Sequence, residues 1–122
     1  MYKVLVCDDE KDIVSAISIY LTSDGYEVIP ARNGLEALDI VKHNDVHLVL
    51  MDIMMPVMDG MTATRVIRSF ARADAKTIPI IAMTANAFDE DAKKCIEAGM
   101  NAHLTKPIEI DRVIEALGQY CR

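Results

Sequence analysis

Short apolar runs alternate with longer amphipathic segments along the chain, and this alternation predicts its secondary structure. Five runs of this kind occur, at Lys3–Cys7, Glu27–Ala31, 47–51, 78–83 and Ala102–Thr105. Runs of this length and composition are typical of β-strands. The stretches VLV and HLVLM lack polar alternation, which indicates strands that are buried on both faces of a sheet.

Apolar residues recur with helical spacing in the segments between these runs. The first segment stops near Asp24-Gly25, and the second opens at Asn33 with Glu36 three residues later, which resembles a capping box. Two further helices are expected over 61–73 and Asp89–Ala98. The apolar stripes of the first and last helices are formed by Ile13, Ile17, Tyr20 and Leu21, and by Ile110, Val113, Ile114 and Leu117.

Five strands that alternate with five helices predict an α/β fold, a doubly wound parallel sheet with helices on both faces. Right-handed crossovers leave few strand orders. We expect the order 2-1-3-4-5, that of flavodoxin-like folds, with 47–51 central because it is among the most uniformly apolar runs. No linker, repeat or low-complexity stretch interrupts the pattern, so one domain over 1–122 is predicted.

Composition and charge narrow the classes of partner. The chain has 122 residues, 52% of them hydrophobic, and a formal net charge of −6, which disfavours direct binding to nucleic acid or to anionic membranes. No segment approaches membrane-spanning length or forms a secretory signal. Cys7, Cys95 and Cys121 cannot all pair and show no metal-ligand spacing. A cytoplasmic protein with free thiols is therefore expected.

Polar side chains follow the predicted strands at the edge where ligands bind in such sheets. The first strand is followed by Asp8 and Asp9, the third by Asp52, the fourth by Thr84 and the fifth by Lys106. Singly, each has a structural explanation: an acid caps the next helix, and a threonine bonds a loop. Asp59-Gly60 likewise reads as a turn signal.

Together these residues point to a metal site. Carboxylates about 5 Å apart at an effective dielectric of about 20 repel each other by roughly 3 kcal/mol per pair, and a divalent cation removes that repulsion. All-oxygen ligands suit Mg²⁺. Asp52 beside Mg²⁺ would be a nucleophile toward a phosphoryl group, with Lys106 and Thr84 placed to neutralise the phosphoryl oxygens.

Four motifs carry a resemblance to a known family over essentially the whole chain. They are CDDE after the first strand, LVLMDIMMPVMDG around Asp52, IIAMTA in the fourth strand and HLTKP in the fifth. With these motifs in this order, the sequence resembles the chemotaxis-regulator-like receiver domains of response regulators in two-component signalling. The resemblance implies a phosphorelay domain, not an enzyme, in which Asp52 accepts a phosphoryl group from a phosphohistidine of a histidine kinase or a histidine phosphotransfer protein.

The same resemblance implies roles for the neighbouring residues. Asp9 and Asp52 would ligate Mg²⁺ directly, Asp8 through water, and Met54 through its backbone carbonyl. Lys106 would pair with a phosphoryl oxygen, and the Thr84 hydroxyl would move toward it. The Lys106–Pro107 bond would be cis.

The output side departs from the commonest family pattern at one position. His103 stands where many relatives carry a tyrosine or phenylalanine switch, and two interpretations stay open: an exposed histidine at the strand end, or a switch.

The resemblance also has implications for the output. Phosphorylation would change the face formed by segment 89–120, and a downstream effector protein or domain would bind that face. Met54 and Asn86 supply no acid to orient water, so slow dephosphorylation is expected. The parent architecture, a standalone domain or part of a hybrid kinase or larger regulator, is left open.

Three alternatives share parts of this pattern. A phosphatase of haloacid-dehalogenase type needs a second aspartate two residues after the nucleophile, where this chain has Met54. A flavodoxin-like FMN carrier needs a phosphate loop after the first strand, and the acids Asp8, Asp9 and Glu10 would repel phosphate there. A degenerate receiver acting only as a binding module would lack part of the acid, threonine and lysine set.

Overall fold

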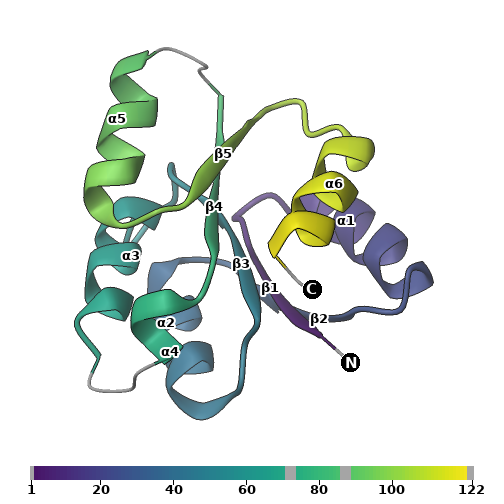
Figure 1. Ribbon diagram of the computed structural model, residues 1–122, viewed down its shortest axis with the longest axis horizontal. Helices are drawn as coiled ribbons and strands as arrows, with labels where there is room; N and C mark the ends of the chain where they lie inside the picture. Colours follow the sequence, from purple (N-terminus) through teal and green to yellow (C-terminus); the bar gives the residue numbers. More distant parts are fainter. Residues whose placement is uncertain (1, 71–73, 86–88, 121–122) are drawn as a thin grey trace.

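The five predicted strands form one parallel sheet. The computed structural model describes residues 2–70, 74–85 and 89–120 of the chain (Figure 1). Its strands are β1 (Lys3–Cys7), β2 (Glu27–Ala31), β3 (Leu48–Asp52), β4 (Ile80–Thr84) and β5 (Ala102–Thr105). Their order in the sheet is β2-β1-β3-β4-β5 with every pair parallel. The predicted 2-1-3-4-5 order is thus confirmed.

Helices cover both faces of this sheet. They are α1 (Lys11–Ser23), α2 (Gly34–His43), α3 (Gly60–Arg68), α4 (Asp74–Thr77), α5 (Asp89–Ala98) and α6 (Ile110–Tyr120). Figure 1 shows α1 and α6 together on one side of the sheet and α2, α3 and α5 on the other. None of the helices in the described ranges is both long and apolar enough to span a bilayer.

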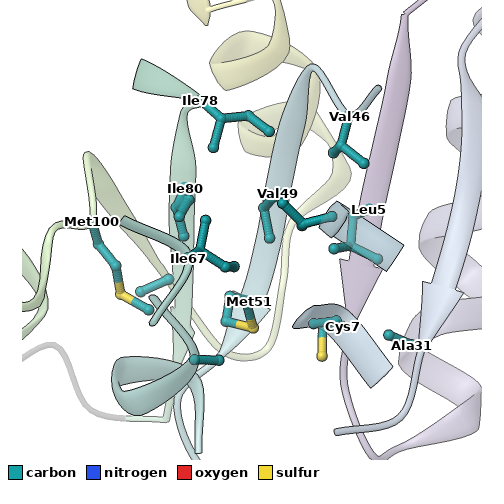
Figure 2. Packing of buried hydrophobic residues seen from close by; sticks show 14 of the residues in the cluster. Leu5, Cys7, Ala31, Val46, Val49, Met51, Ile67, Ile78, Ile80 and Met100 are labelled. Carbon is teal, nitrogen blue, oxygen red and sulfur yellow. The ribbon is translucent and has the colours of Figure 1, made fainter. Parts of the chain in front are cut away.

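Two hydrophobic cores lie on opposite faces because successive strand residues point to opposite sides. In β3, Val49 and Met51 pack with Ile67 of α3 in one core (Figure 2), while Leu48 and Leu50 join the other core under α1 and α6. All five residues of β3 are buried. The sheet is therefore apolar on both faces, as the uniformly apolar run predicted.

The third helix is shorter than its sequence pattern predicted. The prediction of one helix over 61–73 is wrong at its end: α3 stops at Arg68, where the Ser69 N–H bonds to carbonyls of Arg65 and Val66. Residues 71–73 lie outside the described ranges, and a separate short helix, α4, begins at Asp74. Phe70, in the turn after α3, packs against the first core. Ile67 and Phe70 thus both face this core, as their helical spacing predicts.

The Arg68 side chain connects the C-terminal end of α3 to two other segments. Its Nε and Nη2 atoms donate to the Gly99 carbonyl at 3.0 and 2.8 Å, and Nη1 donates to the Ala75 carbonyl at 3.1 Å. Nη2 also donates to Asn101 Oδ1 at 2.9 Å. The far end of α3 is thus tied to α4 and to the turn between α5 and β5.

Two residues of the predicted apolar stripes are exposed, so that part of the prediction is wrong. Tyr20 of α1 is 54% exposed and Ile114 of α6 is 38% exposed, whereas Ile17, Leu21, Val113 and Leu117 are buried. On each of these helices, fewer residues face the sheet than the apolar pattern of the sequence predicted. The wider pattern overcounts because a helix packed on one face of a sheet buries only the residues that point toward the strands.

Replacing Leu50 by alanine tests whether the second core determines stability. Leu50 is fully buried, and truncating such a leucine costs about 2–5 kcal/mol through lost contacts and a cavity. We expect the free energy of unfolding, measured by urea titration, to fall by that amount in Leu50→Ala. Leu35→Ala, at a position that is 50% exposed in α2, is the control and should change stability by about 0.5 kcal/mol or less. Equal effects of the two substitutions would contradict this account of the core.

Candidate functional site

The C-terminal ends of four strands meet at one edge of the sheet. Backbone hydrogen bonds extend the pairing past the strand ends: Asp8 N–H to the Ala31 carbonyl at 3.1 Å, and Lys106 N–H to the Thr84 carbonyl at 2.7 Å. Asp52 is the last residue of β3, and Thr84 is the last residue of β4. Parallel pairing therefore delivers these side chains to a common edge, as the sequence predicted.

Three carboxylates gather at this edge. Asp8, Asp9 and Asp52 each place a carboxylate oxygen within 4.8 Å of the others. Asp8 is 1% exposed and Asp52 is 2% exposed, while Asp9 faces solvent. Two of the three acids are thus removed from water, which strengthens their mutual repulsion.

Lys106 offsets part of this negative charge. Its Nζ lies 3.1 Å from Asp8 Oδ2, 3.3 Å from Asp52 Oδ2 and 3.9 Å from Glu10 Oε1. Burial alone would lower the pKa of Lys106, but the interactions with Asp8 and Asp52 outweigh burial and raise that pKa. The side chain therefore stays an ammonium and balances one carboxylate of the three.

Backbone amides orient the two buried carboxylates. The Met54 N–H donates to Asp52 Oδ1 at 3.1 Å, and the Glu10 N–H donates to Asp8 Oδ1 at 2.9 Å. Each bond joins an aspartate to the residue two positions later, as short polar side chains do in turns. One oxygen of each carboxylate is thereby fixed, and the other points toward the Lys106 ammonium.

The pKa of Asp52 is raised to about 6. Burial is the main cause, and the neighbouring Asp8 charge adds to it; the Met54 N–H and Lys106 act in the opposite direction. At pH 7 the carboxylate is therefore mostly ionised. It is also less stable in that form than an exposed aspartate would be.

The donor set fits a hard divalent cation. Asp8 Oδ2 is buried and accepts no directed hydrogen bond from the described residues, although it lies 3.1 Å from Lys106 Nζ. One ammonium shared by two buried carboxylates leaves part of their negative charge uncompensated, which is costly away from water. Oxygen ligands on one exposed and two buried carboxylates, with access to water, match the coordination that Mg²⁺ prefers.

Gly60 shapes the site in a way that sequence reasoning missed. A Cβ at Gly60 would overlap the backbone carbonyl oxygen of Asp52. Asp59 caps α3 by accepting the Thr62 N–H at 2.8 Å. The Asp59-Gly60 pair, predicted only as a turn, starts α3 directly against the end of β3. The glycine itself was the available signal, because a close approach of another backbone segment is one reason for a glycine at the start of a helix.

The remaining predicted residues lie at different distances from this cluster. Thr84 is 2% exposed at the end of β4, one residue beyond Met83, the register partner of Asp52. The Lys106–Pro107 peptide bond is cis.

Three further predicted residues lie outside the acid cluster or are not described. His103 is exposed on β5, opposite Ala82 in the register, and is not brought to the acid cluster. The Met54 side chain is 74% exposed; metal binding by its carbonyl stays a prediction. Asn86 lies outside the described residues.

Comparison with known proteins decides the family. The family model of the response regulator receiver domain, which describes the sequences of that family, matches residues 4–118 of this chain. The chain belongs to the response regulator receiver family. The recognition made from the four motifs is confirmed, and the chain is a receiver domain homologous to those of histidine kinases and response regulators.

Individual relatives of this receiver domain support the same conclusion. The sensor histidine kinase RcsC of Escherichia coli K12 is 36% identical over 117 residues, which cover 96% of the chain. The chain spans 12% of that kinase's length, and 15% of two plant histidine kinases that it also resembles.

Solved structures match the receiver domain over nearly its full length. The chemotaxis protein CheY4 of Vibrio cholerae has a TM-score of 0.91 at 29% identity, with 98% of each chain covered. The receiver domain of the sensor histidine kinase PA1611 from Pseudomonas aeruginosa PAO1 has a TM-score of 0.88 at 34% identity, covering 98% of this chain and 96% of that one. The latter structure has a magnesium ion coordinated in its active-site cleft.

The raised pKa of Asp52 predicts a pH-dependent stability without divalent metal. The unfolded carboxyl titrates near its ordinary 3.8, and the folded one near 6. Between these values the native state binds more protons, so stability falls as pH rises. In buffer with EDTA we expect Asp52→Asn to exceed wild type at about pH 7 by about 1–2 kcal/mol, and the difference to vanish near pH 4.

Urea unfolding across this pH range measures the effect. Asp12→Asn, which removes an exposed carboxylate of α1, is the control and should follow the wild-type curve. A wild type that is more stable than Asp52→Asn at neutral pH would disprove the assignment.

Cys7 lies directly beneath the acid cluster, and its environment makes it unreactive. Its Sγ is buried 3.3 Å from the Asn33 carbonyl oxygen and 3.4 Å from Met55 Sδ. Burial, followed by the charges of Asp8 and Asp52, raises the pKa of this thiol to about 12. The nucleophilic thiolate is therefore scarce at neutral pH.

Alkylation of Cys7 should accordingly depend on unfolding. In the native receiver domain we expect iodoacetamide to modify Cys7 at least about 100-fold more slowly than in concentrated urea, because burial and the raised pKa act together. Peptide mapping by mass spectrometry quantifies the modification at this position. Similar rates in the two conditions would show that the thiol is neither buried nor shifted.

Proposed function

We propose that Asp52 is the phosphoryl acceptor of this receiver domain and that a phosphohistidine of a histidine kinase or a histidine phosphotransfer protein is the donor. One observation supports this most directly: the buried Asp52 carboxylate shares an edge with two further carboxylates within 4.8 Å and with the Lys106 ammonium at 3.3 Å. A purely structural sheet end has no use for such crowding of charge.

Mg²⁺ is the cofactor that this donor set favours. Asp9 and Asp52 would bind it directly, with the Met54 carbonyl as a third protein ligand. Asp8 would act through water, as the family resemblance implies, while its two oxygens accept the Glu10 N–H and face Lys106. When bound, the ion neutralises phosphoryl oxygens and brings the anionic donor close to an anionic nucleophile.

The chain's own residues supply the rest of the transfer. An oxygen of the ionised Asp52 carboxylate forms a bond to phosphorus as the P–N bond of the phosphohistidine breaks, and the imidazole leaves with the electron pair. Lys106 pairs with one phosphoryl oxygen, and the Thr84 hydroxyl donates to another. No general base is needed, because Asp52 has already lost its proton at neutral pH.

The phosphoryl group would be read out on the face formed by α5, β5 and α6. Movement of Thr84 toward the phosphoryl group would shift this face between two populations, and a downstream effector protein or domain would bind one of them. His103 lies exposed on this face, so both readings of it, switch or bystander, stay open. We propose a cytoplasmic signalling domain over 1–122 that loses its phosphoryl group slowly and contacts neither nucleic acid nor membrane directly.

Intact-mass analysis tests the central proposal. With Mg²⁺ and the small phosphodonor phosphoramidate, wild type should gain the mass of one phosphoryl group, and Asp52→Asn should gain none. Asp12→Asn, with an exposed carboxylate on α1, is the matched control and should load like wild type. EDTA should abolish loading in every variant.

Two results would contradict the proposal. Wild type that stays unmodified with several donors would exclude acceptance, and equal loading of Asp52→Asn would place the phosphoryl group elsewhere. Sustained hydrolysis of a phosphomonoester would instead favour the haloacid-dehalogenase type of phosphatase.

A further inference from the structure

A second hollow adjoins the acid cluster. It occupies about 670 Å³ between the loop after β3, helix α3 and helix α5, which pack side by side in Figure 1. Thr84 and Ala85 are among its lining residues. None of the carboxylates of Asp8, Asp9 and Asp52 lines it, so this groove adjoins the metal and acceptor site and shares only Met54 and Thr84 with it.

The floor of the groove is rich in methionine. It is lined by Ile53, Met54, Met55 and Met61, and Met54 is 74% exposed. Methionine side chains are flexible and polarisable, and they are common where a surface must adapt to apolar groups of different shape. An exposed apolar surface of this kind, rimmed by polar residues, is typical of an interaction site.

Two cations stand at the rim of the groove among the residues that the structure describes. Arg65 projects from α3 and Lys94 from α5, and both are exposed. Met61 and Arg65 are four residues apart in α3, which places the thioether and the guanidinium on the same face of the helix. Among the lining residues that the structure describes, the only acid is Asp59, whose carboxylate accepts the Thr62 N–H at 2.8 Å.

This local excess contrasts with the chain as a whole. The formal net charge of the chain is −6, whereas the described lining of this groove has two cations and one acid. The described lining is therefore more positive than the chain as a whole. Groups with a carboxylate near an apolar side chain would be complementary to both the rim and the floor.

We propose that this groove binds an extended peptide segment of a partner protein in which acidic residues flank an apolar side chain. The apolar side chain would lie on the methionine floor, and the carboxylates would face Arg65 and Lys94. A peptide fits better than a small molecule because Met54, Arg65 and Lys94 are all exposed. Such a surface covers a ligand on one side only, whereas small-molecule sites bury most of their ligand.

Titration of the full chain with a defined peptide tests this assignment. The probe is Ser-Asp-Leu-Phe-Asp-Ser, and the readout is amide chemical shifts of the unmodified protein in buffer with EDTA. We expect saturable shifts at Met54, Met61, Arg65 and Lys94. Because phosphorylation is absent, the outcome does not depend on whether Asp52 accepts a phosphoryl group.

Charge reversal at the rim provides the decisive comparison. Arg65→Glu and Lys94→Glu should each weaken the peptide about fivefold to tenfold. Arg112→Glu makes the same change in net charge on α6, on the opposite side of the sheet, and should leave the affinity within about twofold. A peptide with lysine in place of both aspartates should not bind.

Each of the opposite results overturns the proposal. These are an absence of shifts at millimolar peptide, shifts confined to other surfaces, equal binding of the lysine peptide, or an equal effect of Arg65→Glu and Arg112→Glu. Groove shifts that depend on protein concentration alone, without peptide, would assign the surface to a second copy of this chain and would also overturn it.

Discussion

The contact of the Lys106 ammonium with the carboxylates of Asp8 and Asp52 is the interaction on which the rest of the site depends. Its distances of 3.1 and 3.3 Å place one positive charge between two buried negative ones. Two carboxylates about 5 Å apart repel by roughly 3 kcal/mol at an intermediate dielectric of about 20, and a single ammonium cannot cancel three of them. The edge therefore keeps a negative excess that a hard cation can neutralise.

The fold makes this edge by using each strand twice. Alternate residues of a strand anchor two cores on opposite faces, and the residue that follows the apolar run is left at the rim with a polar side chain. In β3, the first four residues belong to the two cores, and Asp52 ends the strand. The first four residues of β3 thus contribute to stability, and the fifth contributes to the site.

This arrangement, in which a polar residue directly follows each buried apolar run, explains why the sequence predicted the sheet and the acid cluster well. Uniformly apolar runs identify buried parallel strands, and parallel strands bring their ends together whatever the helices do. The grouping of Asp8, Asp9, Asp52 and Lys106 follows from that rule alone. Exposed Tyr20 and Ile114 were harder to predict, because helical spacing shows that a face is apolar without showing how much of it the flat sheet covers.

Features that depend on contacts between distant segments were not predictable from local pattern. The end of α3 at Arg68, the separate helix α4 and the approach of Gly60 to Asp52 all arise from tertiary packing. The groove is a further case, since Arg65 and Lys94 are far apart in sequence and belong to different helices. Periodicity places residues on a helix face; it does not say which other helix that face will meet.

Helix α3 is restrained at both of its ends, by the contact of Gly60 with β3 and by the bonds of Arg68 to Gly99 and Ala75. A helix held at both ends is restrained from moving relative to the sheet when a ligand binds beside it. Because Gly99 directly follows α5, the same Arg68 bonds hold the C-terminal end of α5 close to α3. The separation of the two helices is therefore fixed at that end of the groove.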